Sequence, residues 1–273
     1  MMKITKYLIL LFAAIMLNSN AQAQDQEYGV FLGSSAYRGD LDQTPFAGRG
    51  LRLAVGGIYK YHFTPKLAFK AGLNFTYLGG YDHRNYDINS TDLTEKSLAT
   101  RNLTFYTHLI ELSGQLEYSF LNYVPGSKKY NFTPYVFGGV GLINFNPKAN
   151  IAGTVYTLKD YETEPGKSYS TTQIVIPIGL GIKKTFGKDN MWNIGLQAGW
   201  RMTFTDYLDD ASSKAPLTFT DATTRLLALR NYTNGKNNQP GMIRGNPNNN
   251  DAYFMVGFTI SKTIRKYECA KID

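Results

Sequence analysis

The residue types that could carry out acid–base chemistry are few in this sequence and far apart. The three histidines, His62, His83 and His108, fall in three separate segments. His83 follows Asp82 in a polar stretch that also holds Ser90, so a Ser/His/acid set is conceivable, but the spacing matches no catalytic motif. The sequence contains no His-Glu-x-x-His, phosphate-binding loop or Gly-x-Ser-x-Gly motif. We therefore predict no catalytic residues and no cofactor.

A second group that could do chemistry is a set of three carboxylates. Asp206, Asp209 and Asp210 cluster just past an aromatic-rich segment. Three carboxylates can hold Ca²⁺, whose preferred ligands are oxygen atoms. The alternative, which we favour, is a loop whose acids pair with lysines, arginines or the loop's own backbone.

Cys269 is the only cysteine and lies close to the C-terminus. An unpaired cysteine in an exported protein indicates a free thiol or an intermolecular disulfide. An incidental cysteine in a tail is the alternative, and the sequence leaves both open.

Export is predicted by residues 1–23, which have the features of a secretory signal peptide. This segment carries Lys3 and Lys6 near its start, continues with an apolar stretch over residues 7–17 that is too short to span a membrane, and ends in Ala-Gln-Ala at residues 21–23. Gln24 would then begin the mature protein; the alternative is an N-terminal anchor. Removing the two lysines takes the formal net charge from +8 to +6, a scattered surplus from which we predict no nucleic-acid binding.

The elements that position these residues are predicted from an alternating pattern, clearest over residues 192–204. Alternate positions carry Trp192, Ile194, Leu196, Ala198, Trp200, Met202 and Phe204, whereas the positions between them are polar or small. Side chains of a strand alternate between two faces, so one face is apolar. A path of roughly 40 Å, tilted by about 40°, rises roughly 30 Å and crosses an outer membrane. Trp192 and the Trp200/Phe204 pair would mark the two membrane interfaces.

Seven further segments show comparable alternation. They predict strands over residues 28–37, 51–63, 67–78, 105–120, 133–144, 172–186 and 252–264. Pro177 falls inside one of them and predicts a bulge or an irregular pair, because proline cannot donate to a strand ladder. The segment 133–144 is apolar on both faces and rich in glycine, which would let bulky neighbours enter the interior or let the strand bend.

The connections between these strands alternate between long and short. The long ones cover residues 38–49, 79–103, 145–171 and 205–251, and the last is expected to hold a short helix near residues 221–231, capped by Thr220 or Asp221. No apolar run of 18 residues follows the N-terminus. The predicted fold class is all-β: an eight-stranded antiparallel transmembrane β-barrel with long outer loops and short periplasmic turns. A large soluble β-sandwich is the alternative, and it does not explain the alternating loop lengths.

This fold divides the chain into a signal peptide (1–23), a barrel (24–264) and a periplasmic tail (265–273), with both termini in the periplasm. An eight-stranded barrel is narrow enough for side chains to fill. The charged residues predicted to point inward are Arg52, Lys60, Lys70, Glu111, Glu117, Lys183 and Arg201. Because charges of both signs in a low-dielectric interior should pair, we predict a plugged barrel and not a diffusion pore.

Four stretches of the chain together resemble the PorG-like outer-membrane barrels, which include a component of the type IX secretion system. These stretches are residues 34–41, 132–141, 199–210, and 244–246 together with 250–253. The positions that carry the resemblance are Gly39, Asp40, Trp200, Arg201, Asp206, Tyr207, Asp209, Arg244, Gly245 and Asn246. The resemblance implies an outer-membrane barrel without catalytic activity that docks a periplasmic ring, built from a secretion-system lipoprotein and its partner protein.

The C-terminal tail fits this expectation. In the oxidising periplasm, Cys269 could form an intermolecular disulfide with a ring partner, helped by Arg265, Lys266 and Lys271 as docking charges. The first hypothesis is therefore a non-enzymatic anchor in the outer membrane of a Gram-negative bacterium, with membrane lipid and the ring as its partners. The second is a generic outer-membrane barrel for adhesion or envelope stability, and the third is a lipid-modifying barrel enzyme.

Overall fold

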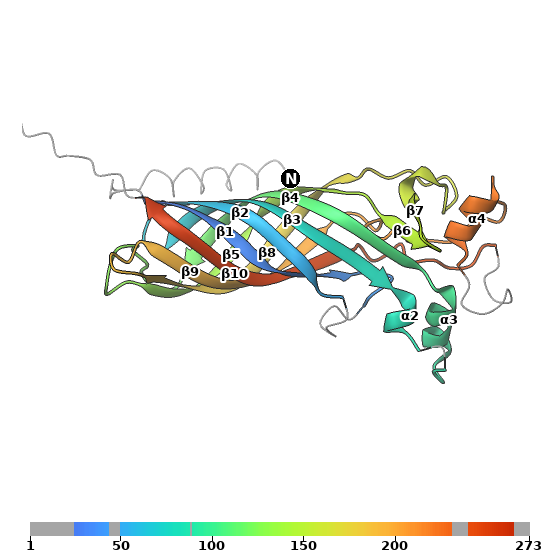
Figure 1. Cartoon of the computed structure of the whole chain (residues 1–273), viewed down its shortest axis with the longest axis horizontal. Helices are drawn as coiled ribbons and strands as arrows, with labels where there is room; N and C mark the ends of the chain where they lie inside the picture. Colours follow the sequence, from blue (N-terminus) through green and yellow to red (C-terminus); the bar gives the residue numbers. More distant parts are fainter. Residues whose placement is uncertain (1–24, 44–49, 88, 231–239, 265–273) are drawn as a thin grey trace, which may run out of the picture.

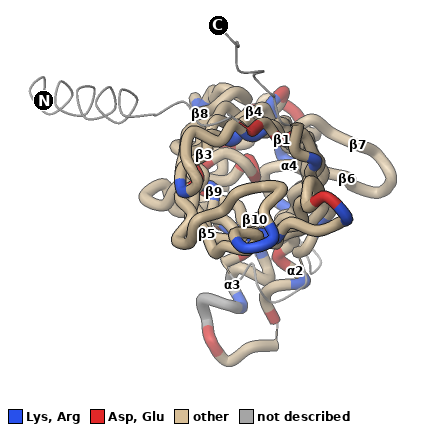
Figure 2. The backbone as a smooth tube through the Cα atoms, turned by 90° about the vertical axis from the view of Figure 1, so that its left-hand side faces the viewer, with Lys and Arg blue, Asp and Glu red and all other residues tan. Residues whose placement is uncertain are grey.

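Eight strands of the computed structural model, which describes residues 25–43, 50–87, 89–230 and 240–264, close into a barrel (Figures 1 and 2). They are β1 (Gln26–Arg38), β2 (Arg52–His62), β3 (Leu67–Tyr81), β4 (Thr104–Ser119), β5 (Phe132–Phe145), β8 (Thr172–Phe186), β9 (Trp192–Thr203) and β10 (Ala252–Ile264). Each strand pairs antiparallel with its neighbours, and β1 pairs with β10 to complete the ring. The predicted eight-stranded antiparallel barrel is confirmed.

The strand ends agree with the predicted ones to within a few residues, and Pro177 has a local effect. The β5–β8 ladder is interrupted opposite Ile176 and Pro177 and then resumes in the same register. On the other side, Pro177 pairs in register with Arg201 of β9. The predicted irregular pair is therefore present, and no residue is inserted into the strand. The ladder is interrupted on the β5 side because Pro177 has no N–H to donate to it.

The outward-facing side chains form an apolar belt. Leu116 and Ile178 expose 38% and 43% of their surface, and Leu180 exposes 62%. Such a surface around a closed barrel requires lipid instead of water, because exposed apolar area on this scale is unfavourable in water. The three residues are not gathered in a shared internal core, which excludes the sandwich alternative.

Aromatic residues mark both edges of the belt. Near one edge, the rings of Phe186 and Trp192 lie 6.5 Å apart, and near the other, those of Trp200 and Phe254 lie 6.1 Å apart. His108 belongs to the second edge, where its ring packs against Tyr77. Aromatic girdles at two levels are typical of barrels that span a membrane.

The two ends of the barrel differ, as Figure 1 shows. Residues 63–66, 120–131 and 187–191 form the short-turn end, where β1 begins and β10 ends. The described parts of the other connections form the long-loop end; they are residues 39–43, 50–51, 82–87, 89–103, 146–171, 204–230 and 240–251. The predicted alternation of short and long connections is therefore confirmed.

The long-loop end contains short elements of its own. They are α2 (Asp82–Asn85), α3 (Leu93–Arg101), β6 (Lys148–Ile151), β7 (Thr154–Thr157), the 3-10 turn η1 (Leu158–Asp160) and α4 (Ala222–Ala228). α4 is the predicted helix, and Asp221 caps it by accepting a hydrogen bond of 2.8 Å from the Thr224 amide. The β6–β7 hairpin was not predicted; it turns through Ala152 and Gly153, both with positive φ. No helix in the described ranges is long and apolar enough to cross a membrane.

The interior is filled, but not everywhere with polar residues. Next to the long loops lies an apolar core whose members include Phe31, Leu78, Phe105 and Phe145 from the strands and Leu208 from a loop. This apolar core beneath the long loops was not predicted from the sequence. Loops folded over the barrel mouth exclude water there, so inward positions near them can be apolar.

Glycines make room for the bulky residues of β5. Tyr135 and Phe137 are buried in the interior. A side chain at Gly181 would overlap the Tyr135 ring, and one at Gly179 or Gly199 would overlap the Phe137 ring. Bulky β5 residues thus enter the interior beside glycines of β8 and β9, whereas the prediction was that the glycines of residues 133–144 would admit bulky neighbours.

Candidate functional site

The first candidate site is a cluster of four charges in the half of the barrel next to the short turns. The Glu117 carboxylate lies 3.2 Å from the ammonium groups of Lys60 and Lys70 and 3.0 Å from that of Lys183. All four residues are buried. We call this group, Glu117 with Lys60, Lys70 and Lys183, the lysine cluster. It confirms the predicted pairing of inward charges across the interior.

Aromatic rings make cation–π contacts with the ammonium groups of the lysine cluster. The Lys70 ammonium lies 4.4 Å from the centre of the Phe137 ring, and the Lys183 ammonium lies 4.9 Å from that of Tyr135. Such contacts stabilise cations that have lost their water. Three lysines on one carboxylate are therefore held by ring faces as well as by Glu117.

The ends of the polar interior are closed by further pairs. Toward the short turns, the Tyr123 hydroxyl donates to Asn193 over 2.7 Å. Toward the long loops, Glu111 lies 3.5 Å from the Arg201 guanidinium and accepts a hydrogen bond of 2.7 Å from Tyr253. Together with the lysine cluster between them, these buried pairs fill the interior with side chains, as the prediction of a plugged barrel required.

Arg52 differs from the other residues predicted to point inward. It is only half-buried, and its guanidinium lies over the rings of Tyr77 and Tyr81, at 5.5 Å and 5.7 Å. Arg52 also donates to the Tyr81 hydroxyl over 3.4 Å. The expectation that every inward charge pairs with an opposite charge is therefore wrong for Arg52, whose long side chain reaches the rings near the barrel mouth.

The second candidate site lies at the long-loop end and is centred on Arg244. Its guanidinium lies 3.3 Å from both Glu164 and Asp210. It also donates to the backbone carbonyls of Ala228 and Asp210, each over 2.8 Å. One buried arginine thus joins the loop that contains Glu164 to three parts of the loop between β9 and β10.

A second arginine connects this centre to the other two long loops. Arg101 pairs with Asp82 over 2.6 Å, and it donates to the backbone carbonyls of Asp40 and Arg244. The Asp40 carboxylate in turn accepts from the Asn246 amide over 3.0 Å. All four long loops therefore meet in one buried network. We call it the loop cluster; its members are Tyr37, Asp40, Asp82, Arg101, Glu164, Asp206, Asp209, Asp210, Arg244 and Asp251.

Tyr37 anchors the loop between β9 and β10 to the barrel. Its hydroxyl lies 2.6 Å from Asp209 and 2.9 Å from Asp251. Asp251 also accepts from the Leu208 amide, and Asp209 accepts from the Ala211 amide, both over 2.9 Å. The beginning and the end of this long loop are thereby fixed to the end of β1.

Acids outnumber bases in the loop cluster, and their pKa values reflect this. Burial raises the pKa of Asp210 to about 6 despite the neighbouring Arg244, and it raises that of Asp206 to about 7. Burial, with repulsion from neighbouring carboxylates, raises the pKa values of Asp209 and Asp251 well above the ordinary value. The cluster therefore holds protons more firmly than free carboxyl groups do.

Two of the three candidate metal ligands have separate partners. Asp209 bonds to Tyr37, whereas Asp210 accepts from Thr163 over 2.6 Å and from Tyr169 over 2.7 Å. Within the described ranges, no three His, Cys, Asp or Glu side chains are placed to hold a metal ion. Asp210 also pairs with Arg244, and Asp209 accepts from a backbone amide of its own loop, which are contacts of the kind that the favoured alternative describes.

Two glycines of the resemblance motifs permit close approaches in the loop cluster. A side chain at Gly39 would overlap the Tyr37 hydroxyl and an Asp251 carboxylate oxygen. A side chain at Gly245 would overlap an Asp40 carboxylate oxygen and the Ser212 backbone. Only glycine leaves the space that these contacts require.

The structure brings most of the resemblance positions together. Those in or against the loop cluster are Gly39, Asp40, Asp206, Asp209, Arg244, Gly245 and Asn246. Tyr207 lies beside it and stacks on Tyr169 at 4.7 Å. Trp200 faces outward under the Arg38 guanidinium, and Arg201 faces inward against Glu111. The shared motifs therefore describe mainly how the long loops are tied together.

The conceivable Ser/His/acid set is not assembled. Asp82 is buried, and its two carboxylate oxygens accept from Arg101 and from the Leu103 amide. His83 is exposed and packs against the Tyr81 ring. Asp82 therefore does not orient His83 for general-base chemistry. The tail residues Arg265, Lys266, Cys269 and Lys271, like the signal peptide, lie outside the described residues.

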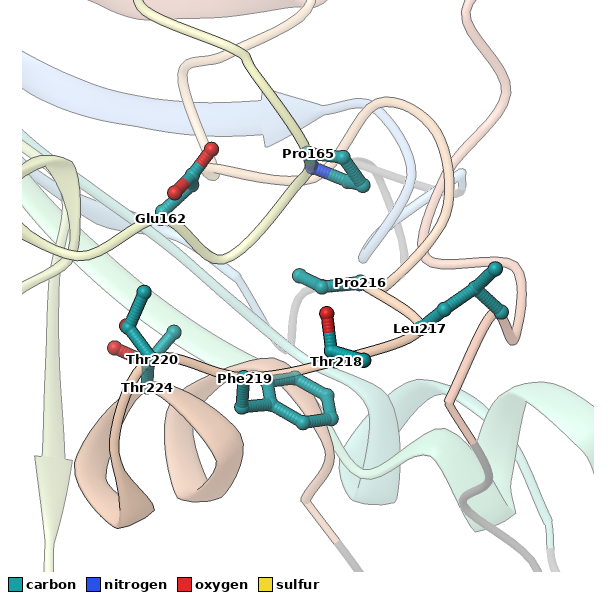
Figure 3. Close-up of a pocket in the computed structure, with 8 residues that line it drawn as sticks. All are labelled: Glu162, Pro165, Pro216, Leu217, Thr218, Phe219, Thr220 and Thr224. Atoms are coloured by element: carbon teal, nitrogen blue, oxygen red, sulfur yellow. The ribbon is translucent and has the colours of Figure 1, made fainter.

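A groove of about 420 Å³ lies on the surface of the long-loop end (Figure 3). It is lined by Glu162, Pro165, Pro216, Leu217, Thr218, Phe219, Thr220 and Thr224. Leu217 is 77% exposed beside it, and Ile243, in a neighbouring hollow, is 64% exposed. Apolar side chains thus face the surroundings at the end of the barrel as well as on the belt.

Comparison with known proteins places this architecture in a family. A family model described as a domain of unknown function (DUF6089) matches residues 5–271. The chain belongs to the DUF6089 family. No curated protein matches the DUF6089 chain.

Several solved structures are similar to the DUF6089 barrel. Ail of Yersinia pestis, in complex with the heparin analogue sucrose octasulfate, has a TM-score of 0.41 and 9% identity, covering 89% of this chain and 100% of that one. The N-terminal β-barrel domain of Pseudomonas aeruginosa OprF has a TM-score of 0.36 and 13% identity, covering 90% and 100%. A major outer membrane protein of Thermus thermophilus has a TM-score of 0.37 and 13% identity, covering 90% and 100%.

Several members of the DUF6089 loop cluster were not predicted from sequence. Glu164, Asp82 and Arg101 lie in long polar loops, where no periodicity separates a buried charge from a solvated one. Asp251 was within a resemblance stretch but was not singled out. The position of Asp251, directly before the first residue of a strand, could have identified it. A side chain at such a position can accept hydrogen bonds from the neighbouring loops.

Proposed function

We propose that this protein is a non-enzymatic integral outer-membrane barrel that anchors or docks a periplasmic ring complex of the type IX protein secretion machinery. The filled interior carries the proposal. The lysine cluster around Glu117 and the pair of Glu111 with Arg201 occupy the space that a pore would need. A barrel that conducts nothing can still hold other proteins at a fixed place in the membrane.

The apolar belt and its aromatic edges support membrane lipid as the first partner. Belt residues such as Leu53 and Leu180 are more than 60% exposed, and Trp192 lies at one edge. Burying this surface in lipid recovers about 25 cal/mol for each Å² of apolar area. The barrel is thereby a stable fixed point for an assembly on one side of the membrane.

The short-turn end is the side we assign to the periplasm. Single-chain outer-membrane barrels have short periplasmic turns and long outer loops. β1 begins at Gln26 and β10 ends at Ile264, both at the short-turn end (Figure 1). The tail that follows Ile264 would then face a ring lipoprotein and its partner protein, with Arg265, Lys266 and Lys271 as docking charges.

Deletion of the gene tests the secretion role. Loss of the barrel should reduce export of secreted proteins while other outer-membrane proteins remain at normal levels. Purification after mild solubilisation should recover the periplasmic ring together with the barrel. Normal export in the deletion strain, with no ring proteins in the purified complex, would contradict the secretion role and leave the barrel itself intact.

Cys269 offers a more specific test of docking. We propose that its thiol forms an intermolecular disulfide with a ring partner, because the periplasm is oxidising. Non-reducing electrophoresis of whole envelopes should show a high-mass adduct that Cys269→Ser removes. If the adduct is unchanged in that variant, the tether is absent.

A second function, adhesion or envelope stability, is favoured by the groove at the long-loop end. Leu217 and Ile243 are exposed there, away from the lipid belt. An adhesin would act through this outer surface and would not recover ring proteins on purification. Replacing Leu217 and Ile243 by serine should then reduce attachment to surfaces without changing export.

Lipid modification is the third function, and its test is direct. His83→Ala should abolish modification of lipid by an enzyme that depends on this residue. Since Asp82 is committed to Arg101, we expect no change in lipid composition.

A further inference from the structure

Tyr37 bridges two carboxyl groups with a hydroxyl that has only one proton to donate. Its single hydroxyl oxygen lies 2.6 Å from Asp209 Oδ2 and 2.9 Å from Asp251 Oδ1. A tyrosine hydroxyl carries one proton and can donate to only one acceptor at a time. If both carboxyl groups were ionised, one of the two contacts would place an oxygen lone pair against a carboxylate, with no hydrogen between them.

The remaining oxygen atoms of both carboxyl groups are already assigned. Asp209 Oδ1 accepts from the Ala211 amide, and Asp251 Oδ2 accepts from the Leu208 amide. The missing proton must therefore lie on one of the two oxygens that face Tyr37. The contact of 2.6 Å has the length of a bond from a hydroxyl to an ionised carboxylate, whereas 2.9 Å is ordinary for a neutral pair.

We propose that Asp251 is protonated at neutral pH and that the chain Asp251 to Tyr37 to Asp209 is a proton-held latch for the outer loop. Asp251 Oδ1–H donates to the Tyr37 oxygen, and the Tyr37 hydroxyl donates to the Asp209 carboxylate. The latch needs the extra proton, and loss of that proton replaces one hydrogen bond by repulsion.

The groups around the latch provide little positive charge to neutralise its two carboxyl groups, which favours neutralisation by a proton. The carboxyl group of Asp40, on the loop between β1 and β2, and that of Asp206, on the same loop as Asp209, act on Asp209, and Asp206 also acts on Asp251. Arg101 of α3 is in electrostatic range of Asp209, but its strongest partner is Asp82.

Among the residues that the structure describes, the neighbouring elements place no further Lys or Arg in ion-pair contact with Asp209 or Asp251. Arg244 lies against Asp210 and Glu164, whereas β4 presents the Phe105 ring to the Tyr37 ring at 4.8 Å. An additional observation supports a shortage of positive charge: Asp206 Oδ2 is buried and, within the described residues, has no hydrogen-bond partner.

The latch holds both ends of the loop over the barrel mouth. Asp209 lies six residues after Thr203, the last residue of β9, and Asp251 directly precedes β10. The Asp251 carbonyl also accepts from the Thr203 hydroxyl over 2.6 Å, so the loop ends are joined at the rim. Opening the latch would release the rim segment around Leu208 and Ala211 while the strands below keep their ladders.

The pH dependence follows from the direction of the shifts. Burial and neighbouring carboxylates raise the pKa values of Asp209 and Asp251 in the folded protein well above the ordinary value. A raised pKa means that the folded state binds the proton more tightly than the unfolded state does. The latch is therefore closed at low pH and opens as the pH rises through the pKa of the coupled pair.

Hydrogen exchange of the full-length barrel in detergent micelles tests the latch. The readout is the protection factor, corrected for intrinsic exchange, of a peptide that contains the Leu208 and Ala211 amides, measured from about pH 5 to about pH 10. In the wild type, protection should fall by about tenfold to a hundredfold as the pH rises, because the hydrogen bond from Asp251 to Tyr37 is replaced by repulsion. A peptide from a barrel strand should show no such fall.

Two isosteric variants remove the need for the extra proton. Asp251→Asn keeps a donor toward the Tyr37 oxygen and an acceptor toward the Leu208 amide, so its protection should stay high across the whole pH range. Asp209→Asn also places a donor toward the Tyr37 oxygen, whose hydroxyl then donates to Asp251, so its protection should likewise not fall with pH. Tyr37→Phe removes the bridging hydroxyl, so its protection should be low at every pH, and Asp160→Asn, a change of an exposed acid at the same end, should follow the wild type.

Three results would overturn the latch. One is a wild-type profile that stays flat up to about pH 10. Another is a fall in protection with rising pH in Asp251→Asn and Asp209→Asn that equals that of the wild type, which would show that these two carboxyl groups do not set the pH dependence. The third is loss of protection at neutral pH on adding a chelator, with recovery on adding Ca²⁺, which would show that a cation and not a proton neutralises the pair.

Discussion

Two buried groups of charge lie toward opposite ends of the barrel, and they use different cations. The lysine cluster places three lysines around Glu117 and is held entirely by strands. The loop cluster uses Arg101 and Arg244 and is held mostly by loops. Bases exceed acids in the first, and acids exceed bases in the second among the described residues.

The difference follows from the backbone around each cluster. Strands satisfy one another's carbonyl groups in the ladder, so a lysine in the barrel needs only a carboxylate and a ring face. Loops leave carbonyl groups unpaired, and an arginine can reach several at once with its five N–H donors. Arg244 donates to the carbonyls of Ala228 and Asp210, and Arg101 to those of Asp40 and Arg244. Each cluster has the cation that its backbone requires.

The largest effect should come from removing the shared acid of the lysine cluster. Glu117→Gln keeps the shape of the side chain but leaves Lys60, Lys70 and Lys183 buried without their carboxylate. Breaking a buried ion pair in this way costs about 3–5 kcal/mol. Thermal unfolding of the purified barrel in detergent should shift to a clearly lower temperature.

The matched control is Glu162→Gln, because Glu162 is exposed at the long-loop end and accepts only a local amide bond from Gly166 among the bonds described. It should melt like the wild type. Equal melting temperatures for Glu117→Gln and the wild type would show that the three lysines do not depend on Glu117.

The loop cluster should respond locally where the lysine cluster responds globally. Arg244→Met removes the partner of Glu164 and Asp210 and the donor to three carbonyl groups. We expect a local loss of about 2–4 kcal/mol, seen as faster protease cleavage within residues 146–171 and 204–251. Barrel melting should stay almost unchanged, because the strands keep their pairing.

Arg225→Met is the control for this prediction, since Arg225 is exposed on α4. Its cleavage rate should match that of the wild type. If Arg244→Met lowers the barrel melting temperature as much as Glu117→Gln does, the two clusters are not independent, and the comparison above fails.

The same contrast explains how far the sequence could predict the structure. The lysine cluster was predictable because alternation along a strand assigns each charge to a face, and a narrow barrel leaves those charges only one another as partners. Lys60, Glu117 and Lys183 were identified in this way, although their individual contacts were not.

The loop cluster could be predicted only in part. The resemblance motifs named Gly39, Asp209 and Arg244, but no periodicity showed that these residues would meet. Glu164 was missed because nothing in a polar loop marks a charge as buried. Contacts between residues far apart in the sequence depend on where the strands place the loop ends, which local patterns do not contain. The apolar core beneath the loops was missed for the same reason.

Gly39 tests how closely the loop cluster is packed. Gly39→Ala would place a methyl group against the Tyr37 hydroxyl and the Asp251 carboxylate. We expect a local loss of about 1–3 kcal/mol, because overpacking forces neighbouring groups apart. Hydrogen exchange at the Leu208 amide should become faster.

Gly57→Ala is the matched control on the barrel, since an added methyl group there would meet no atom within 4 Å. It should leave both hydrogen exchange and melting unchanged. Faster exchange in both variants would point to a general effect of alanine on these strands and their ends, and would remove the special role of Gly39.

The smallest effect is expected for Asp206→Asn, which tests whether the excess of acids weakens the long-loop end. Burial raises the pKa of Asp206 from 3.8 to about 7. The folded pKa lies above the unfolded one, so the stability due to protonation is complete below about pH 4 and is lost as the pH rises to about 7. Asparagine cannot ionise, so the variant should match the wild type near pH 4 and exceed it by up to about 1 kcal/mol near pH 8.

Protease cleavage of residues 204–251 at these two pH values measures the difference. Slower cleavage of Asp206→Asn near pH 8, with equal rates near pH 4, would show that an ionised acid is tolerated in the loop cluster only at a loss of stability. The corresponding change in the lysine cluster, Lys70→Met, removes one cation of an excess and should likewise be tolerated, because Glu117 keeps Lys60 and Lys183. Faster cleavage of Asp206→Asn near pH 8 would instead show that its negative charge stabilises the loops, so that the loop cluster is not short of cations.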